Sequence, residues 1–199
     1  MYHFTKRFFD IFISLIILTL FLPVFLLVSC IIIISSGFPV FYLQERVGKD
    51  WKPFKIIKFR TMIRNADKIG PGVSLSNDGR ITFIGKFLRR SKFDEMPQFI
   101  NVLLGNMSLI GPRPELKKFA DYYPMEYSEL LKIRPGIIGY ASIKFRNESD
   151  LFVNVGEVES FYINEVLPQK LKLCKKYMNE MSFATDLKTF LKTARALVL

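Results

Sequence analysis

Cysteine and histidine are scarce in this sequence. Its 199 residues include two cysteines, Cys30 and Cys174, and one histidine, His3. Neither cysteine has a second cysteine or a histidine at the spacing of a metal site, which argues against a zinc module and a disulfide framework. The cysteine usage agrees with a reducing, cytoplasmic setting for the soluble part. The length predicts one domain with a substantial core, and no internal repeat divides it.

Acidic residues are also few relative to basic ones. The chain has 18 Asp and Glu against 29 Lys and Arg, a net charge of +11, and residues 46–99 alone hold 13 cations and 5 acids. Such a surface attracts phosphates, whether on nucleotides, nucleic acids or lipid headgroups. Composition does not choose among these partners.

Charged side chains are absent from residues 11–34. A helix of this length reaches about 36 Å, enough for the hydrocarbon core of a bilayer, and we expect it to insert. Pro23 removes a backbone hydrogen bond near its middle and bends it. Lys6 and Arg7 precede the segment and the basic region follows it, so both flanks favour the cytoplasmic side. The residues themselves leave a spanning helix and a re-entrant helix open, and both are favoured over a cleaved signal peptide.

The rest of the sequence predicts an α+β fold. Short alternating patterns bounded by turn residues indicate strands, and apolar residues at helical spacing indicate helices. The last helix has an apolar stripe and a basic face, as in helices that lie on a membrane or cover a core. We expect strands at 39–46 and 53–62, a loop at 63–80, helices at 82–90 and 94–105, a short strand and turn at 107–115, a turn and strand at 134–145, and helices at 156–178 and 183–198.

Two adjacent carboxylates, Asp94 and Glu95, interrupt the most basic stretch and precede Pro97. A helix start is the commoner explanation, because Asp is a favoured N-cap and Glu and Pro suit the first turn. The same geometry also suits phosphate chemistry. At a helix N-terminus both carboxylates can converge and stay ionised, and Arg89 nearby can bind a diphosphate.

Two carboxylates beside a phosphate predict a Mg²⁺ site, since this ion commonly takes one or two carboxylates together with phosphate oxygens. An ionised Asp is also a recognised covalent nucleophile in phosphoryl transfer. Lys58 and Arg60 flank Phe59 in the second predicted strand, and the alternation places both cations on one face. A solvated strand edge explains these two cations equally well.

Several segments then resemble a known family. They are "KFRTM" (58–62), "LRRSKFDEMPQFINVLLGNMSLIGPRPE" (88–115), "RPGIIG" (134–139), "SFATDLK" (182–188), and "KRFFDI" before the proline-broken apolar run. Together they resemble the bacterial sugar transferase family, the monotopic polyprenyl-phosphate phosphoglycosyl transferases, in its small form that consists of the catalytic domain only. The resemblance covers nearly the whole chain, with the motifs in the family's order.

The resemblance implies a reaction: transfer of a sugar-1-phosphate from a UDP-sugar to polyprenyl (undecaprenyl) phosphate, with release of UMP, as the first membrane step of a surface glycan. By motif match, Asp94 is the expected nucleophile, which forms an aspartyl phosphosugar intermediate, and Glu95 the expected Mg²⁺ ligand. The expected substrate-binding residues are Lys58, Arg60, Arg89, Pro112, Arg113, Pro114 and Asp186, of which Arg60 is chosen for its place beside Lys58.

The resemblance also implies a monotopic architecture. Residues 1–36 form the re-entrant helix with both ends cytoplasmic, and residues 37–199 form a catalytic domain with a small β element and amphipathic interfacial helices. It would lie on the cytoplasmic face of the bacterial inner membrane. The expected partners are the UDP-sugar donor, the polyprenyl phosphate acceptor and membrane lipid, with no nucleic acid, and a homodimer stays open.

The chain departs from the family pattern at three places. Leu22 precedes Pro23 where Ser or Thr is frequent, Ile138 stands where Thr is common, and the acidic segment 146–166 matches poorly, so the sugar is left open. Two rival functions remain: a polyprenyl-phosphate glycosyltransferase that releases UDP, and a membrane-anchored basic protein without catalysis. The second has no recognised nucleic-acid motif to support it.

Overall fold

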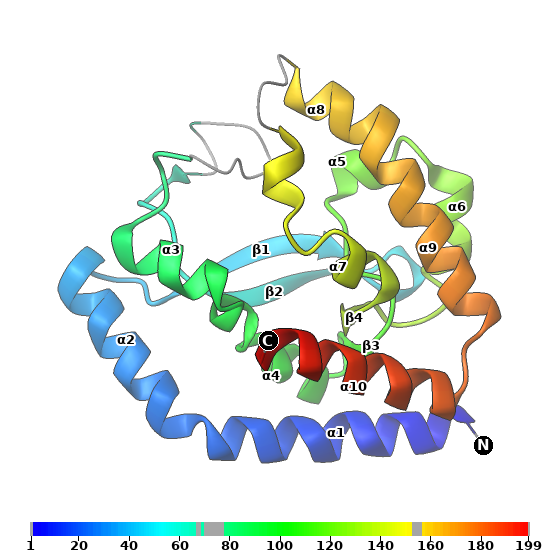
Figure 1. The fold of residues 1–199 in the computed structure, drawn as a ribbon, viewed down its shortest axis with the longest axis horizontal. Helices are drawn as coiled ribbons and strands as arrows, with labels where there is room; N and C mark the ends of the chain where they lie inside the picture. Colours follow the sequence, from blue (N-terminus) through cyan, green and yellow to red (C-terminus); the bar gives the residue numbers. More distant parts are fainter. Residues whose placement is uncertain (1, 67–68, 70–77, 153–156, 199) are drawn as a thin grey trace.

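A computed structural model describes residues 2–66, 69, 78–152 and 157–198. It mixes helices with two small sheets, which confirms the α+β class (Figure 1). Most of the predicted loop 63–80 lies outside the described residues. The elements are α1 (Tyr2–Leu20), α2 (Leu22–Ser36), β1 (Phe41–Val47), β2 (Pro53–Phe59), α3 (Phe83–Arg90), α4 (Gln98–Leu103), β3 (Ser108–Ile110), α5 (Lys117–Ala120), α6 (Pro124–Leu130), β4 (Gly136–Ile138), α7 (Tyr140–Lys144), α8 (Val158–Phe161), α9 (Leu167–Asn179) and α10 (Phe183–Val198).

The apolar N-terminal segment forms two helices with a sharp bend between them. α1 and α2 meet at Phe21 at an angle of 60°, and Pro23 lies in the first turn of α2, where its missing N–H costs no helical hydrogen bond. The predicted bend is therefore present. Within the described residues, neither helix alone is long and apolar enough to cross a membrane, whereas the bent pair meets both criteria together.

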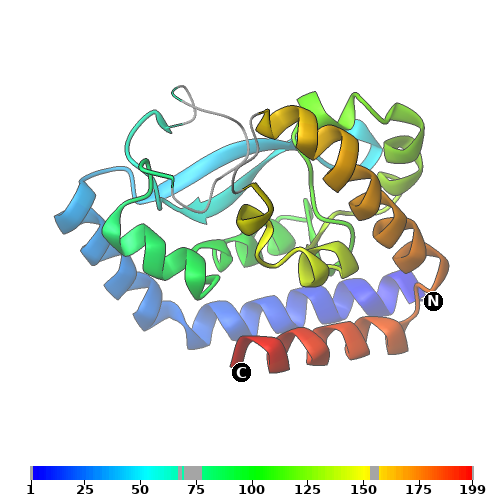
Figure 2. The ribbon, with the colours of Figure 1, turned by 45° about the horizontal axis from the view of Figure 1, so that its top comes forward.

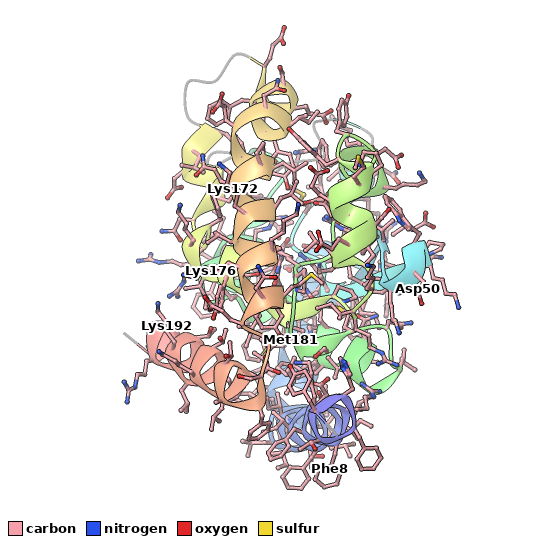
Figure 3. The ribbon with its side chains drawn as sticks, turned by 90° about the vertical axis from the view of Figure 1, so that its right-hand side faces the viewer. Phe8, Asp50, Lys172, Lys176, Met181 and Lys192 are labelled. Carbon is pink, nitrogen blue, oxygen red and sulfur yellow. The ribbon has the colours of Figure 1, made fainter. Side chains whose placement is uncertain are left out.

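α1 has one apolar face and one polar face that contacts the rest of the protein. Phe8 is 61% exposed and points away from the molecule (Figure 3), whereas Asp10 is buried and accepts a hydrogen bond from the Leu109 N–H at 3.0 Å. The Arg7 guanidinium donates to the carbonyl oxygen of Val102 at 2.8 Å. Because these partners belong to β3 and α4, the polar face of α1 fixes it beneath both elements (Figure 1).

The strands β1 and β2 correspond to the two predicted strand segments, although β2 ends at Phe59 rather than at residue 62. They pair as an antiparallel hairpin, with Phe41 opposite Phe59 and Val47 opposite Pro53. Phe54 and Ile56 alternate along β2 and are buried on one face, and Phe59 is buried on the opposite face. Phe59 packs against Phe25 of α2, with ring centroids 5.3 Å apart. The hairpin thus joins the bent helix to the core.

Only part of the predicted segment 134–145 is a strand. β4 pairs in parallel with β3 over three residues and ends at Ile138, after which Gly139 leads into α7. A strand continues only where a partner offers hydrogen bonds, and β3 ends at Ile110. The backbones approach closely here, since a Cβ on Gly136 would lie 2.1 Å from the Gly111 nitrogen.

The C-terminal helices occupy the predicted ranges. α8 continues through the π-helical turn Tyr162–Val166 into α9, and α10 then returns beside α1 (Figure 2). Phe183 of α10 contacts Phe9 of α1, with ring centroids 4.7 Å apart. The start and the end of the chain therefore form one layer below the hairpin.

Candidate functional site

The acid pair lies in a short 3-10 helix, Phe93–Glu95, between α3 and α4. Lys92 adopts a left-handed conformation (φ 58°) that turns the chain after α3, and the Met96 N–H then donates to the Phe93 carbonyl oxygen at 3.2 Å. Asp94 is therefore inside this turn, and the expectation that it is the N-cap of the following helix is wrong. α4 begins later, and its N-cap is Pro97.

Glu95 is held by two cations. Its Oε1 lies 2.8 Å from the Lys58 Nζ, and Arg113 donates to both carboxylate oxygens, with its Nη1 3.0 Å from Oε2. Burial favours the neutral acid, but the charges of Arg113 and Lys58 outweigh it and hold the Glu95 pKa well below its usual range. Glu95 is therefore ionised at neutral pH.

Asp94 lies beside Glu95 in a different environment. It is 7% exposed, and burial together with the Glu95 charge raises its pKa, although Lys58, Arg89 and Lys92 oppose the shift. In the part of the chain that the structure describes, no side chain forms an ion pair or a hydrogen bond with its carboxylate. Its oxygen lone pairs are therefore not committed to a donor among the described residues.

Arg89 lies close to the acid pair, whereas Arg60 makes its contacts at the end of α2. The Arg89 Nε donates to the Thr61 hydroxyl oxygen at 2.8 Å. The Arg60 guanidinium donates to the carbonyl oxygens of Ser36 and Gly37, at 2.8 and 2.5 Å, where α2 ends. Arg60 thus caps the C-terminal carbonyls of α2, a contact that sequence alternation does not predict.

These groups border one large cavity of 1670 Å³. Typical ligand pockets measure roughly 300–1,000 Å³, so there is room here for more than one substrate group. The lining includes every predicted site residue except Asp186: Lys58, Arg60, Arg89, Asp94, Glu95, Pro112, Arg113 and Pro114. The structure therefore brings together residues that lie up to 56 positions apart in the chain.

Asp186 lies elsewhere, at the junction of α1, α9 and α10. Its Oδ2 accepts hydrogen bonds from the Tyr2 hydroxyl at 2.8 Å and from the Lys6 ammonium at 2.5 Å, and its Oδ1 accepts one from the Tyr177 hydroxyl at 2.7 Å. Asp186 is buried, and it is not among the described residues that line the cavity. Its contacts join helices from the two ends of the chain.

A second set of charged residues lines the cavity and was not predicted from sequence. Glu115 accepts hydrogen bonds from Arg46 at 3.1 Å and from the Tyr162 hydroxyl at 2.5 Å. The Lys170 ammonium donates to the Tyr162 oxygen at 3.1 Å and forms an ion pair with Glu148. The only local signal was the position of Glu115 after Pro114, because the other contacts join residues far apart in sequence.

A comparison with protein-family models now bears on this arrangement. The model described as "Bacterial sugar transferase" matches residues 1–199, the whole chain. The chain belongs to the bacterial sugar transferase family. This confirms the family resemblance that the motifs indicated. The acid pair and its cavity therefore lie in a protein whose named relatives are enzymes.

Relatives within the bacterial sugar transferase family carry specific names. A UDP-N-acetylgalactosamine-undecaprenyl-phosphate N-acetylgalactosaminephosphotransferase of Aeromonas hydrophila is 43% identical over 145 residues, which are 71% of this chain and 34% of the relative. A UDP-glucose:undecaprenyl-phosphate glucose-1-phosphate transferase of Escherichia coli (strain K12) is 37% identical over 188 residues, 92% of this chain and 38% of the relative.

A further relative, of Caulobacter vibrioides, has the same name as the Escherichia coli protein and is 34% identical over 198 residues, 97% of this chain and 69% of the relative. The chain thus spans little more than a third of the first two relatives and about two thirds of the third. The relatives' names also contain two different sugars, so they do not choose a sugar for this chain.

Proposed function

We propose that this protein transfers a sugar-1-phosphate from a UDP-sugar to polyprenyl phosphate and releases UMP. An Asp94 oxygen attacks the sugar-linked phosphorus, and the bond from that phosphorus to the bridging oxygen breaks, so that UMP leaves with both electrons of the bond. An oxygen of polyprenyl phosphate then attacks the same phosphorus and displaces Asp94. The product is a polyprenyl diphosphate sugar, and Asp94 is regenerated as a carboxylate.

The environment of Asp94 is the observation that supports this proposal most directly. Its carboxylate is buried, adjoins a cavity and has no described protein donor, so its lone pairs remain available for attack. Burial also raises its pKa, and a more basic carboxylate is a better nucleophile once it is ionised. Arg89 and Arg113 line the same cavity and can stabilise charge on the phosphates in the transition state.

A covalent intermediate suits two anionic substrates. Donor and acceptor both carry phosphates, and they repel each other if they occupy one site together. When the phosphosugar is held on Asp94, UMP leaves before the second phosphate arrives, so the same cations serve both substrates in turn.

The neighbouring carboxylates of Asp94 and Glu95 fit a Mg²⁺ ion beside them, and we assign Glu95 as its ligand. Both offer hard carboxylate oxygens to the cavity, and Mg²⁺ is usually bound by one or two carboxylates with phosphate oxygens and waters. No group of three or more metal-binding side chains occurs among the described residues, so phosphate oxygens would complete the set. When bound, Mg²⁺ supplies electrostatic stabilisation of the phosphates.

We infer a monotopic position on the cytoplasmic face of the inner membrane, with α1 and α2 as a re-entrant pair. The bend of 60°, the exposed apolar side chains of both helices and the cations at both flanks support it. Figure 3 adds that Phe8 points away from the folded domain, as a side chain in lipid would.

Cysteine labelling tests this topology. In a Cys30→Ser background, His3→Cys and Val40→Cys should both react with a membrane-impermeant maleimide only from the cytoplasmic side of oriented vesicles. Cys174 is buried and provides an internal blank. Reaction of the two positions from opposite sides would establish a spanning helix instead.

The decisive test of the reaction is substitution of the nucleophile. Asp94→Asn keeps the size of the side chain but removes its charge, so UMP release from a panel of UDP-sugars should fall by about 10³-fold or more. Binding of the donor should largely survive. Asp50→Asn, at an exposed turn, is the matched control and should keep full activity.

The product separates this reaction from its rivals. A donor labelled in both the sugar and the β-phosphate should transfer both labels to polyprenyl phosphate. When polyprenyl phosphate is left out, both labels should be found on the wild-type protein but not on the Asp94→Asn variant. Release of UDP would support a glycosyltransferase, and full activity of Asp94→Asn would refute catalysis by this carboxylate.

A further inference from the structure

Residues 146–150, from the acidic segment that departs from the family pattern, form part of the cavity wall. Two contacts place them beside the acid pair. The Lys92 ammonium, two residues before Asp94, donates to the Arg146 carbonyl oxygen at 2.9 Å. Glu148 is close enough to Arg113, the partner of Glu95, to help raise the pKa of that guanidinium, after the larger effect of Glu95 itself. The segment therefore adjoins the reaction centre.

The chemistry of this wall differs from that of the phosphate-binding cations. Glu148 forms an ion pair with Lys170, whose ammonium lies 4.7 Å from the centroid of the Tyr162 ring. These groups, with Arg146 and Asp150, carry no net positive charge in total. Such a wall therefore offers little electrostatic attraction to a phosphate. It offers a carboxylate acceptor beside an ammonium and a phenol, the groups that bind neutral hydroxyls and amides.

The Glu148 side chain is partly exposed at the cavity, although one of its carboxylate oxygens is enclosed. Oε1 is enclosed next to Lys170 and has no accessible surface, whereas the side chain as a whole is 27% exposed to the cavity and solvent. Oε2 is therefore the oxygen that can accept from a bound molecule. Lys170 holds the carboxylate in place, which lowers the entropy lost when the ligand binds.

The order of groups in the donor indicates which part lies here. Asp94 must approach the phosphorus atom that carries the sugar, so the sugar must lie next to Asp94. The sugar also remains beside Asp94 after UMP leaves. Resting on the proposed function, we propose that Glu148 determines sugar specificity: its Oε2 accepts a hydrogen bond from a hydroxyl or amide N–H of the donor sugar, and Lys170 positions it.

Donor selectivity tests this inference. Glu148→Gln keeps the shape of the side chain but replaces one acceptor oxygen with a donor group. We expect the ratio of kcat/KM values between UDP-sugars that differ at one hydroxyl or amide to change by about tenfold or more, because a mispaired polar group in a binding site is costly. Inhibition by UMP, which lacks the sugar, should stay unchanged.

Two further variants control the experiment. Glu148→Asp keeps the charge with a shorter reach and should give a smaller change of selectivity, which covers the case in which Glu148→Gln folds poorly. Glu165 also lies in the acidic segment 146–166, but its side chain is exposed. Glu165→Gln should therefore leave every kcat/KM value unchanged. Thermal unfolding of each variant separates folding from selectivity.

The outcomes decide between the two proposals. If wild-type protein releases UMP but neither Glu148 variant changes the selectivity ratio, the inference is overturned and the proposed function stands. If UMP inhibits the Glu148 variants more weakly while the ratio of kcat/KM values between UDP-sugars is unchanged, the wall binds the nucleotide instead. That result would also overturn the inference about Glu148. If wild-type protein releases no UMP from any UDP-sugar, the proposed function itself fails.

Discussion

At the scale of single residues, two adjacent carboxylates have pKa values displaced in opposite directions. Glu95 is paired with Arg113 and Lys58, which hold its pKa well below the usual range in spite of burial. No described side chain pairs with Asp94 in this way, and burial and the Glu95 charge raise its pKa. One residue thus remains a fixed charge, while the other is a more basic carboxylate.

Removal of Lys58 should move the acid limb of the pH profile. Its charge opposes the rise of the Asp94 pKa, so Lys58→Met should raise that pKa further. The reactive carboxylate is present above the Asp94 pKa and is lost as the pH falls through it, so the acid limb of kcat/KM should shift to higher pH. A pH–rate profile of the residual activity measures the shift.

Lys55→Met is the matched control, because Lys55 belongs to the same strand but is exposed. Its profile should coincide with that of the wild type. An unshifted acid limb in Lys58→Met would mean that the limb reports a group other than Asp94.

At the scale of elements, α3 depends on a close approach to the end of β2. The Thr82 hydroxyl caps α3 by accepting from the Gly85 N–H at 3.1 Å, as the predicted helix start at Thr82 requires. A Cβ on Gly85 would lie 2.0 Å from the Thr61 carbonyl oxygen. Because Thr61 also accepts from Arg89, the packing of α3 positions an arginine of the cavity.

Gly85→Ala should therefore affect both stability and activity. The added methyl group must push α3 away from Thr61, at a cost of about 2 kcal/mol in the free energy of unfolding. Arg89 moves with the helix, so we also expect a raised KM for the donor. Chemical denaturation and UMP release measure the two effects.

Gly79→Ala provides the control, since a Cβ there has no neighbour within 4 Å among the described residues. It should change neither quantity appreciably. Wild-type stability in Gly85→Ala would show that α3 can shift without strain.

At the scale of the whole molecule, Asp186 connects the two ends of the chain. Its partners Tyr2 and Lys6 belong to α1 and lie 184 and 180 residues away in sequence. Tyr177, its third partner, also lies 3.4 Å from the carbonyl oxygen of Ile110, just before the turn that contains Arg113. The helix expected to insert in the membrane is thereby joined to the interior of the catalytic domain.

Asp186→Asn should destabilise the protein and loosen α1. The substitution removes the negative charge that pairs with a largely buried Lys6, which should cost about 2 kcal/mol in the free energy of unfolding. Hydrogen exchange in α1 should increase as well. Unfolding by denaturant and exchange measured by mass spectrometry test both expectations.

Asp121→Asn, which removes an exposed ion pair with Lys117, should cost less than about 0.5 kcal/mol and serves as control. Unchanged stability with a raised KM for the donor in Asp186→Asn would instead support the substrate-binding role that the motif implies.

Features that depend on residues close together in the chain could be predicted from the sequence. The first two strands, the range of α3, the bend at Pro23 and the two C-terminal helices are set by alternation, helical spacing and the fixed φ of proline. The acid pair and its family motif were recognisable for the same reason. The strand expected over 134–145 was too long, because its end is set by a partner strand rather than by its own residues.

The sequence by itself therefore determined the α+β class, the bent apolar segment and the family, since each is encoded in contiguous residues. Tertiary structure alone decided which carboxylate is paired, which groups Arg60 and Asp186 contact, and that Glu148 and Lys170 line the same cavity as the acid pair. These contacts join residues 9 to 184 positions apart, and the free energy of such a pair depends on burial and orientation, which no local pattern records.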